Sequence, residues 1–446
     1  MENLETLGYL NMTPIQEQSI PLILEGLDVI GQAKTGSGKT AAFGLGLLQN
    51  LNVKRFRVQT LVLCPTRELA DQVAKEIRRL ARAIHNIKVL TLCGGKPFGP
   101  QIGSLEHGAH IIVGTPGRVE EHLVKGTLNL DNLNTFILDE ADRMLDMGFQ
   151  PALDAIVEFA PKKRQTLLFS ATFPDQIASI ASKIMQQPER VSVAEAHGSE
   201  TIKQHFFKVD DNEHRMVAVR LLLQKHRPKS TIIFCNTKIE TQEVADELAG
   251  RGFSAMAIHG DLDQKDRDQV LVRFASKSIS VLVATDVAAR GLDIDMLDAV
   301  INYHISRDPE VHIHRVGRTG RAGKSGMACS LYSDKESYKV SVIEEMNGLT
   351  VRPEALPSIN YLDKPIDLPS MACFQIDGGK KQKLRAGDIL GALTSDGRIE
   401  GQQVGKINLF DIRAFVAVDI GVASIAYKKL SDGKMKGRSF RVRRLS

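Results

Sequence analysis

The stretch from Asp28 to Leu48 reads DVIGQAKTGSGKTAAFGLGLL. It passes from the apolar run Asp28-Val-Ile through the turn Ala33-Lys-Thr-Gly-Ser-Gly-Lys39-Thr40 into a helix-like segment. Glycines in such a strand–turn–helix arrangement let backbone N–H groups face phosphate oxygens, while the lysine reaches the β and γ phosphates and the threonine hydroxyl helps to hold Mg²⁺. The pattern predicts a phosphate-binding loop whose contacts come from Ala33, Thr35, Gly36, Ser37, Gly38, Lys39 and Thr40.

Short apolar runs that end in polar or Gly-bearing turns recur along the first part of the chain. They are Thr60–Cys64 before Pro65, His110–Gly114 before Thr115, Thr135–Leu138 before Asp139, and Thr166–Phe169 before Ser170. Apolar runs without alternation indicate strands that are buried on both faces, as in a parallel sheet, and helical stretches such as Glu68–Ala83 lie between them. We therefore expect an open α/β domain, in which functional groups gather at the carboxyl ends of the strands.

The same pattern restarts after Thr201, with three further apolar runs at Thr231–Phe234, Ala255–Ile258 and Val281–Val283. We expect two tandem parallel-sheet domains, at residues 1–195 and 200–352, joined near Ala194–Ser199. A second linker is predicted at Pro353–Pro369, which contains four prolines. Residues 371–446 then read β-α-β-β-α-β, which predicts a small α+β domain at the end of the chain.

The tetrapeptide Asp139-Glu-Ala-Asp142 follows an apolar strand about a hundred residues after the phosphate loop. A carboxylate at this place can hold Mg²⁺, partly through water, and its neighbour can orient or deprotonate an attacking water. An acidic tetrapeptide is usually a solvated turn, but behind a buried strand in a chain with a phosphate loop it indicates the second half of an ATPase site. Thr40 and Asp139 are the predicted metal ligands, and Lys39, Asp139 and Glu140 are predicted catalytic residues.

Nine short motifs, in order, resemble those of the DEAD-box RNA helicases over residues 1–350. They are TPIQ (13–16), AKTGSGKT (33–40), PTRELA (65–70), TPGR (115–118), DEAD (139–142), SAT (170–172), HGD (259–261), ATDVAARGLD (284–293) and HRVGRTGR (314–321). The resemblance implies two RecA-like domains and an enzyme that uses ATP and Mg²⁺ to unwind short RNA duplexes locally.

The resemblance also implies a role for each matching residue. Gln16 is expected to read adenine and Asp293 to meet the ribose, and Ser170 and Thr172 are expected to couple ATP hydrolysis to strand separation through hydrogen bonds to the DEAD loop. Arg318 and Arg321 are expected to act as arginine fingers, which requires closure of the two halves. The family's adenine-stacking aromatic upstream of Gln16 would fall before Met1, so either the N-terminus is trimmed or this contact is absent.

An RNA path is implied across both domains. Six residues are expected to hold sugar–phosphate groups: Arg67, Thr115 and Arg118 in the first domain, and Thr237, Gly260 and Thr285 in the second. Such contacts fix the register of the RNA without reading its sequence.

Two other functional classes remain open. One is an ATP-locked RNA clamp, against which the intact Glu140, Arg318 and Arg321 argue. The other is a DNA helicase or general nucleic-acid translocase.

The positive charge is concentrated at the C-terminal end of the chain. Residues 371–446 carry 15 Lys and Arg against 7 Asp and Glu, a surplus of +8, whereas the whole chain of 446 residues carries +5. A small basic domain on a near-neutral body indicates a polyanion-binding module, and a solubilising tail is the alternative. Lys380, Lys381, Arg441 and Arg443 are the predicted RNA contacts of this domain.

The last domain resembles an RNA-recognition motif in its element order, but its aromatic set is degenerate. Phe415 occupies one stacking position, Phe374 is the one candidate partner, and Arg413 and Val418 stand where two other aromatics belong. We therefore expect basic residues to grip a folded RNA element. The tail is similar to the DbpA subfamily of bacterial DEAD-box proteins, which implies a hairpin of large-subunit (23S) ribosomal RNA as partner and a role in ribosome assembly.

The composition, 43% hydrophobic and 25% charged, is typical of a globular protein outside the membrane. No apolar run approaches the roughly 20 residues that span a bilayer, and Met1–Asn11 lacks a signal-peptide pattern. The five cysteines are odd in number, far apart and never CxxC. We expect a cytoplasmic monomer in a reducing compartment, with no membrane partner.

Overall fold

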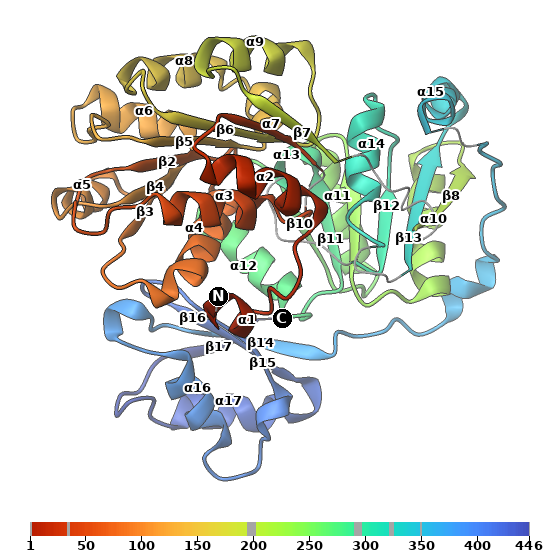
Figure 1. Cartoon of the computed structure of the whole chain (residues 1–446). Coiled ribbons are helices and arrows are strands. Elements are labelled where there is room, and N and C mark those ends of the chain that lie inside the picture. Colours follow the sequence, from red (N-terminus) through yellow and green to blue (C-terminus); the bar gives the residue numbers. More distant parts are fainter. Residues whose placement is uncertain are drawn as a thin grey trace. The chain divides into compact units, whose positions relative to one another are not determined.

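The computed structural model of the chain describes residues 2–33, 36–193, 202–289, 297–320, 325–347 and 350–445 (Figure 1). The chain forms two compact units, residues 1–197 with 291–293, and residues 198–290 with 294–446. The predicted junction at Ala194–Ser199 lies outside the described residues. In the described part of the chain, no helix has both the length and the apolar character that crossing a membrane requires.

The first unit is built on a seven-stranded sheet in the order β3-β4-β2-β5-β6-β1-β7, with every neighbouring pair parallel. Its strands are β1 (Val29–Gln32), β2 (Thr60–Leu63), β3 (Val89–Leu92), β4 (Ile111–Gly114), β5 (Thr135–Asp139), β6 (Gln165–Ser170) and β7 (Glu189–Ser192). Strands β2, β4, β5 and β6 are buried along their whole length. The prediction of a parallel sheet from unalternated apolar runs is therefore confirmed.

Helices cover both faces of this sheet, so it has a hydrophobic core on each side. The helices are α1 (Glu2–Thr6), α2 (Pro14–Leu24), α3 (Lys39–Gln49), α4 (Arg67–Leu80), α5 (Phe98–Glu106), α6 (Pro116–Val124), α7 (Ala141–Asp146), α8 (Gln150–Phe159) and α9 (Asp175–Ile184). Helix α4 shows why such a segment is helical: Thr66 caps its N-terminus by accepting the Leu69 N–H at 3.2 Å. Its buried residues recur every three or four positions, from Leu69 to Leu80, which places them on one face.

The second unit begins with a six-stranded parallel sheet in the order β10-β11-β9-β12-β13-β8. Its strands are β8 (Ile202–Lys208), β9 (Thr231–Cys235), β10 (Ala255–Ile258), β11 (Val281–Thr285), β12 (Ala299–Asn302) and β13 (Gly326–Tyr332). Its helices are α10 (Asn212–His226), α11 (Lys238–Gly250), α12 (Gln264–Ala275), α13 (Asp286–Ala289), α14 (Pro309–Val316) and α15 (Ser337–Asn347). The second α/β domain expected from the repeated pattern is present.

The same unit ends in a four-stranded antiparallel sheet in the order β15-β16-β14-β17. The elements are β14 (Met371–Ile376), α16 (Ala386–Thr394), β15 (Val404–Leu409), β16 (Ala414–Asp419), α17 (Ala423–Asp432) and β17 (Val442–Leu445). Helices α16 and α17 cover one face of the sheet (Figure 1). The predicted β-α-β-β-α-β order is confirmed.

The other face of this small sheet contacts helix α12 of the same unit. Cys373 and Phe415 are fully buried in a cluster with Val272, and the Arg413 guanidinium lies 3.2 Å from the Asp268 carboxylate. Phe374 instead belongs to the core under the helices, where its ring stacks on Tyr427. The expectation that Phe374 partners Phe415 is wrong, because Phe374 pairs with Val416 across the sheet while Phe415 pairs with Gln375, and successive strand residues face opposite sides.

Candidate functional site

The carboxyl ends of three adjacent strands, β5, β6 and β1, bring together the motifs predicted to bind ATP. The phosphate loop follows β1, Asp139–Asp142 ends β5, and Ser170–Thr172 ends β6. Because the strands are parallel, these segments meet at one edge of the sheet. In the sequence the phosphate loop precedes Asp139 by about a hundred residues, and the strand order removes that separation.

The phosphate loop adopts a left-handed backbone conformation at its last residue before helix α3. Gly38, with φ of +94°, precedes Lys39 as the N-cap residue. Lys39 is 6% exposed, and its Nζ donates to the Ala33 carbonyl at 2.5 Å. Burial lowers the pKa of Lys39, and the carboxylates of Asp139 and Glu140 offset part of this effect. A buried ammonium at a helix N-terminus suits an anionic ligand.

The remaining loop residues fit the same interpretation. The Ser37 hydroxyl is buried without a hydrogen-bond partner among the described residues, as expected where an oxygen-rich ligand supplies the partner. Thr40 is half-buried on the first turn of α3, and Gly36 is exposed with φ of +82°. The predicted contact at Thr35 lies outside the described residues.

Gln16 lies against the phosphate loop. Its Nε2 donates to the Gly38 carbonyl at 3.1 Å, and its Oε1 accepts the Thr13 N–H at 2.9 Å. A Cβ at Gly38 would lie 2.4 Å from Gln16 Nε2, so a side chain at this position would displace Gln16 as well as strain the backbone. The buried amide is thereby held in one orientation beside the loop.

Asp139 and Glu140 supply the carboxylates at the end of β5. Burial raises the pKa of Asp139 to about 7, although the Lys39 ammonium lowers it. Glu140 has φ of +53°, unusual for a residue with a side chain and common at functional sites. Its Oε2 is buried and has no hydrogen-bond partner among the described residues. The distance from this oxygen to Arg143 Nε is 3.6 Å. These oxygen donors fit a hard divalent cation such as Mg²⁺, which would keep the Asp139 carboxylate ionised.

Asp142 ties the DEAD loop to the end of β6. Its Oδ2 accepts from the Ala171 N–H at 3.1 Å, the Thr172 N–H at 2.9 Å and the Thr172 hydroxyl at 3.0 Å. The Ser170 hydroxyl accepts the Asp142 N–H at 3.3 Å. Burial opposes ionisation of Asp142, but the hydrogen bonds from Thr172 and Ser170 outweigh it and lower the pKa. Ser170 and Thr172 therefore contact the loop that they were expected to contact.

The other half of the first sheet edge, formed by β3, β4 and β2, carries the three predicted RNA contacts of this unit. Arg67 follows β2, and Thr115 and Arg118 follow β4. The Arg118 guanidinium donates to the Lys96 carbonyl at 3.0 Å, pairs with Glu121 at 3.0 Å and lies over the Phe98 ring. Thr115 is 9% exposed as the N-cap residue of α6.

Two residues that the sequence analysis missed complete this half. A Cβ at Gly95 would lie 1.9 Å from Arg67 Nη1, and one at Gly94 would lie 3.2 Å from Nη2. The two glycines let the guanidinium lie directly on the backbone after β3. A signal was available, since Gly94-Gly-Lys follows an apolar strand just as the other polar turns do.

The second sheet repeats this arrangement at β10, β11 and β9. Gly260 follows β10, Thr285 ends β11, and Thr237 follows β9 as the N-cap residue of α11. Arg318 is 5% exposed, whereas Arg321 and Asp293 lie outside the described residues. The sequence analysis gave no role to Arg315, which is fully buried and bonded to both carboxylate oxygens of Asp286 at 2.7 Å.

The predicted basic contacts of the C-terminal domain are all exposed. Lys380 and Lys381 lie in a short 3-10 helix after β14. Arg441 directly precedes the edge strand β17, and Arg443 lies within it. Asp377, three residues before Lys380, accepts from Arg443 Nη2 at 2.6 Å, and its N–H donates to the Arg441 carbonyl. The sheet therefore brings both basic segments to one place.

Comparisons with protein families match the three sheets. The DEAD/DEAH box helicase model matches residues 13–180, the helicase conserved C-terminal domain model matches residues 213–323, and the DbpA RNA binding domain model matches residues 373–444. The ATP-dependent RNA helicase DbpA of Escherichia coli (strain K12) is 52% identical over 100% of this chain and 97% of its own length. The DEAD-box ATP-dependent RNA helicase CshA of Geobacillus kaustophilus is 46% identical over 77% of this chain and 73% of its own length.

Solved structures give the same result. Saccharomyces cerevisiae Dbp5 bound to RNA and ADP BeF3 has a TM-score of 0.70 at 30% identity, over 79% of this chain and 92% of that chain. Mss116p bound to ssRNA and AMP-PNP has a TM-score of 0.71 at 27% identity, over 80% of this chain and 77% of that chain. With its motif residues at the carboxyl ends of two parallel sheets and relatives that match it throughout, the chain belongs to the DEAD-box family of ATP-dependent RNA helicases and ends in a DbpA-type RNA-binding domain.

Proposed function

We propose that this RNA helicase acts on large-subunit (23S) ribosomal RNA during ribosome assembly, and that its C-terminal domain selects the RNA. The observation that carries the proposal is the match of residues 373–444 to the DbpA RNA binding domain, together with the four exposed basic residues of that domain, of which Arg441 and Arg443 contact Asp377. Five free, buried cysteines suit a reducing cytoplasm, where we expect the chain to act as a monomer.

In the proposed ATP chemistry, Lys39 and the backbone of residues 36–38 bind the phosphates, and Gln16 selects adenine. Glu140 orients or deprotonates the attacking water, because its buried Oε2 needs a donor that the described residues do not supply. Thr40 and Asp139 would hold Mg²⁺, which neutralises charge on the phosphates when bound. Arg318 and Arg321 are assigned to stabilising charge in the transition state, and Asp293 to the ribose.

In the proposed RNA chemistry, phosphate groups are held at the carboxyl ends of β2 and β4 in the first sheet and of β9, β10 and β11 in the second. The residues are Arg67, Thr115, Arg118, Thr237, Gly260 and Thr285. Contacts of this kind position RNA without reading bases. Selection is therefore assigned to the C-terminal domain, where Lys380, Lys381, Arg441 and Arg443 are exposed and Phe374 and Phe415 are both buried.

The test is the steady-state ATPase rate of the full-length chain without RNA, with poly(A), and with 23S ribosomal RNA at equal nucleotide concentration. We expect strong stimulation by ribosomal RNA and little by poly(A). Equal stimulation by both RNAs would still indicate an RNA-dependent ATPase, but it would refute selection of the RNA by the C-terminal domain. The same stimulation by single-stranded DNA would indicate a general nucleic-acid translocase.

A charge-matched pair of variants makes the test specific. In one variant, four basic residues of the C-terminal domain become Gln: Lys380, Lys381, Arg441 and Arg443. In the control, four exposed basic residues of the first unit become Gln: Lys54, Arg55, Lys162 and Lys163. Both lose the same formal charge, so only the first should lose the preference for ribosomal RNA if phosphate contacts in that domain select the RNA.

A further inference from the structure

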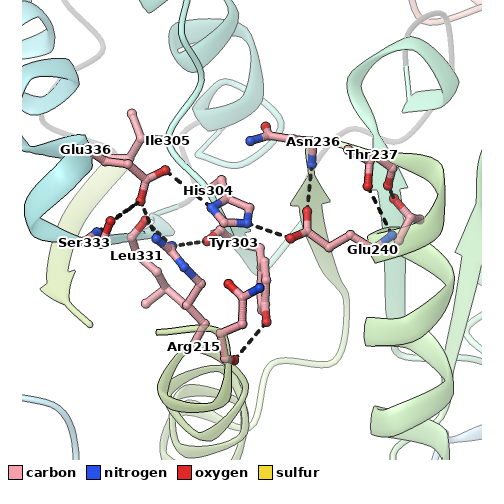
Figure 2. Close-up of polar contacts among 12 residues, drawn as sticks. Arg215, Asn236, Thr237, Glu240, Tyr303, His304, Ile305, Leu331, Ser333 and Glu336 are labelled. Carbon is pink, nitrogen blue, oxygen red and sulfur yellow. Dashed lines mark hydrogen bonds and ion pairs between the residues drawn. The ribbon is translucent and has the colours of Figure 1, made fainter. Parts of the chain in front are cut away.

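A buried polar network links the end of β9 to the segment after β12 in the second unit (Figure 2). At its centre is His304, two residues after β12, whose ring lies between two carboxylates. Its Nε2 is 2.6 Å from Glu240 Oε1, and its Nδ1 is 3.4 Å from Glu336 Oε1. All three side chains are less than a fifth exposed, so water screens these contacts weakly.

The carboxylate of Glu240 connects His304 to the loop proposed to hold RNA. Glu240 Oε2 accepts the Asn236 N–H at 3.1 Å, and the Glu240 N–H donates to the Thr237 hydroxyl at 3.2 Å. One carboxylate therefore holds the backbone after β9 while its other oxygen meets the imidazole. Glu240 therefore contacts the Asn236–Thr237 loop through both its carboxylate and its backbone N–H.

The Glu336 carboxylate is fixed from the other side. It accepts from Arg215 Nη2, from the Ser333 N–H at 3.0 Å and from Lys339 Nζ at 3.3 Å. Burial opposes ionisation of Glu336, but the hydrogen bonds from His304 and Ser333 and the Arg215 charge hold its pKa well below the usual range. Glu336 is therefore an ionised and immobile anchor for the imidazole.

The main chain of His304 is connected through Arg315 to the end of a third strand, β11. The Arg315 guanidinium donates to the His304 carbonyl at 2.7 Å and pairs with Asp286, which directly follows Thr285. His304 thus lies where connections from β9 and β11 meet at the edge of the sheet. Both Thr237 and Thr285 are proposed RNA contacts.

The charges around the ring favour an imidazolium. A neutral imidazole carries one N–H, so it would present a lone pair to one of the two carboxylates. Burial opposes the charge, but the hydrogen bonds that the ring donates to Glu240 and Glu336 outweigh it and raise the pKa of His304. The charged and titratable groups around the ring are Glu240 on α11, Glu336 before α15, Lys339 on α15, Arg215 on α10, Arg315 on α14, and the neighbouring Tyr303.

We propose that His304 is a positioning residue for RNA binding: as an imidazolium shared by Glu240 and Glu336, it fixes the Asn236–Thr237 loop in the orientation that receives a phosphate group. This inference rests on the proposed role of Thr237 in holding RNA. Loss of the proton removes one donor from the Glu240–His304–Glu336 bridge and one positive charge from the phosphate-binding edge. RNA affinity is therefore highest when His304 is protonated and falls as the pH rises through its raised pKa, above the ordinary value near 6.5.

The experiment measures binding of a labelled oligoadenylate to the full-length chain with a non-hydrolysable ATP analogue, from pH 6.5 to pH 9. We expect affinity to fall roughly tenfold across this range, the size of one charge-assisted hydrogen bond. In His304→Gln, affinity is low throughout and independent of pH. In His304→Lys, the ammonium keeps the charge, so affinity stays high at pH 9.

The matched control is His226→Gln, an exposed histidine at the end of α10, which should retain the wild-type pH profile. A His304→Gln variant with the wild-type profile would overturn the proposal, and so would equal affinities of the Gln and Lys variants at pH 9. NMR titration of the His304 ring without RNA gives an independent answer, because a ring already neutral at pH 7 contradicts the imidazolium. Unchanged RNA affinity in Thr237→Val would refute the proposed role of Thr237 instead.

Discussion

The hydroxyl of Thr172 is one of three donors to a single oxygen of Asp142, and it can be removed with little change of shape. Thr172→Val keeps both backbone donors, the Ala171 N–H at 3.1 Å and the Thr172 N–H at 2.9 Å, and deletes only the hydroxyl contact at 3.0 Å. Asp142 remains ionised and attached. The variant therefore loosens the connection between the DEAD loop and the end of β6 without touching Lys39 or Glu140.

The size of the effect follows from the kind of hydrogen bond that is lost. A hydrogen bond to a charged group contributes about 1.5–3 kcal/mol. Because two other donors stay on the same oxygen and Thr172 is only half-buried, the lower end applies, about 1.5 kcal/mol, or roughly tenfold in a rate or equilibrium. If this connection couples the two activities, RNA unwound per ATP hydrolysed falls roughly tenfold, while ATP turnover itself changes little.

The assay compares strand displacement from a short labelled duplex with phosphate release in the same reactions. Thr166→Val is the matched control, since Thr166 is a buried residue of the same strand β6 whose hydroxyl donates to the Ile184 carbonyl at 3.3 Å. It loses an equivalent hydroxyl away from Asp142. Parallel losses of unwinding and ATPase in Thr172→Val, or uncoupling of equal size in the control, would refute the reasoning.

Three further outcomes are expected from the described contacts. Lys39→Ala abolishes RNA-stimulated phosphate release, because the buried ammonium proposed to hold the phosphates is lost. Glu140→Gln retains binding of ATP and RNA, measured by fluorescence anisotropy, but stops phosphate release, since the amide cannot accept a proton from water. Arg215→Ala lowers the free energy of unfolding of the second unit by about 1.5–3 kcal/mol in urea titrations, because the Glu336 carboxylate loses its guanidinium partner but keeps the donors His304, Ser333 and Lys339.

The sheets could be predicted from the sequence because their strands carry a strong local signal. Runs such as Thr231–Phe234 are apolar at every position but the first, and they form strands that are buried along their length. The positions of Asp139 and Thr237 at strand ends follow directly from that prediction. The order of the strands does not, since it depends on packing between distant segments. It decides that Arg67, Gly95 and Thr115 share one half of the edge.

The prediction for Phe374 failed because the face of the sheet on which a strand residue lies depends on the pairing register. Motif alignment does not supply that register. A shift of one residue moves a side chain to the opposite face, and Phe374 lies under the helices while Phe415 contacts α12. His304 could not have been found from its neighbours in sequence. Its partners Glu240 and Glu336 lie 64 and 32 residues away, and only the fold places them on either side of the ring.

The strand order of the first sheet also places the proposed nucleotide site beside the proposed RNA site. The three strands that carry the proposed nucleotide residues (β5, β6 and β1) directly adjoin the three that carry the proposed RNA residues (β3, β4 and β2). The boundary is the β2–β5 pair, which runs in register from Thr60 beside Thr135 to Leu63 beside Leu138. Arg67 therefore follows β2, and Asp139 is the last residue of its neighbour β5 in the same sheet. The DEAD loop and the segment proposed to hold RNA thus leave two strands that are one strand spacing apart, about 4.8 Å. Because packed strands transmit displacement with little compression, this adjacency offers a direct physical route between the two proposed sites.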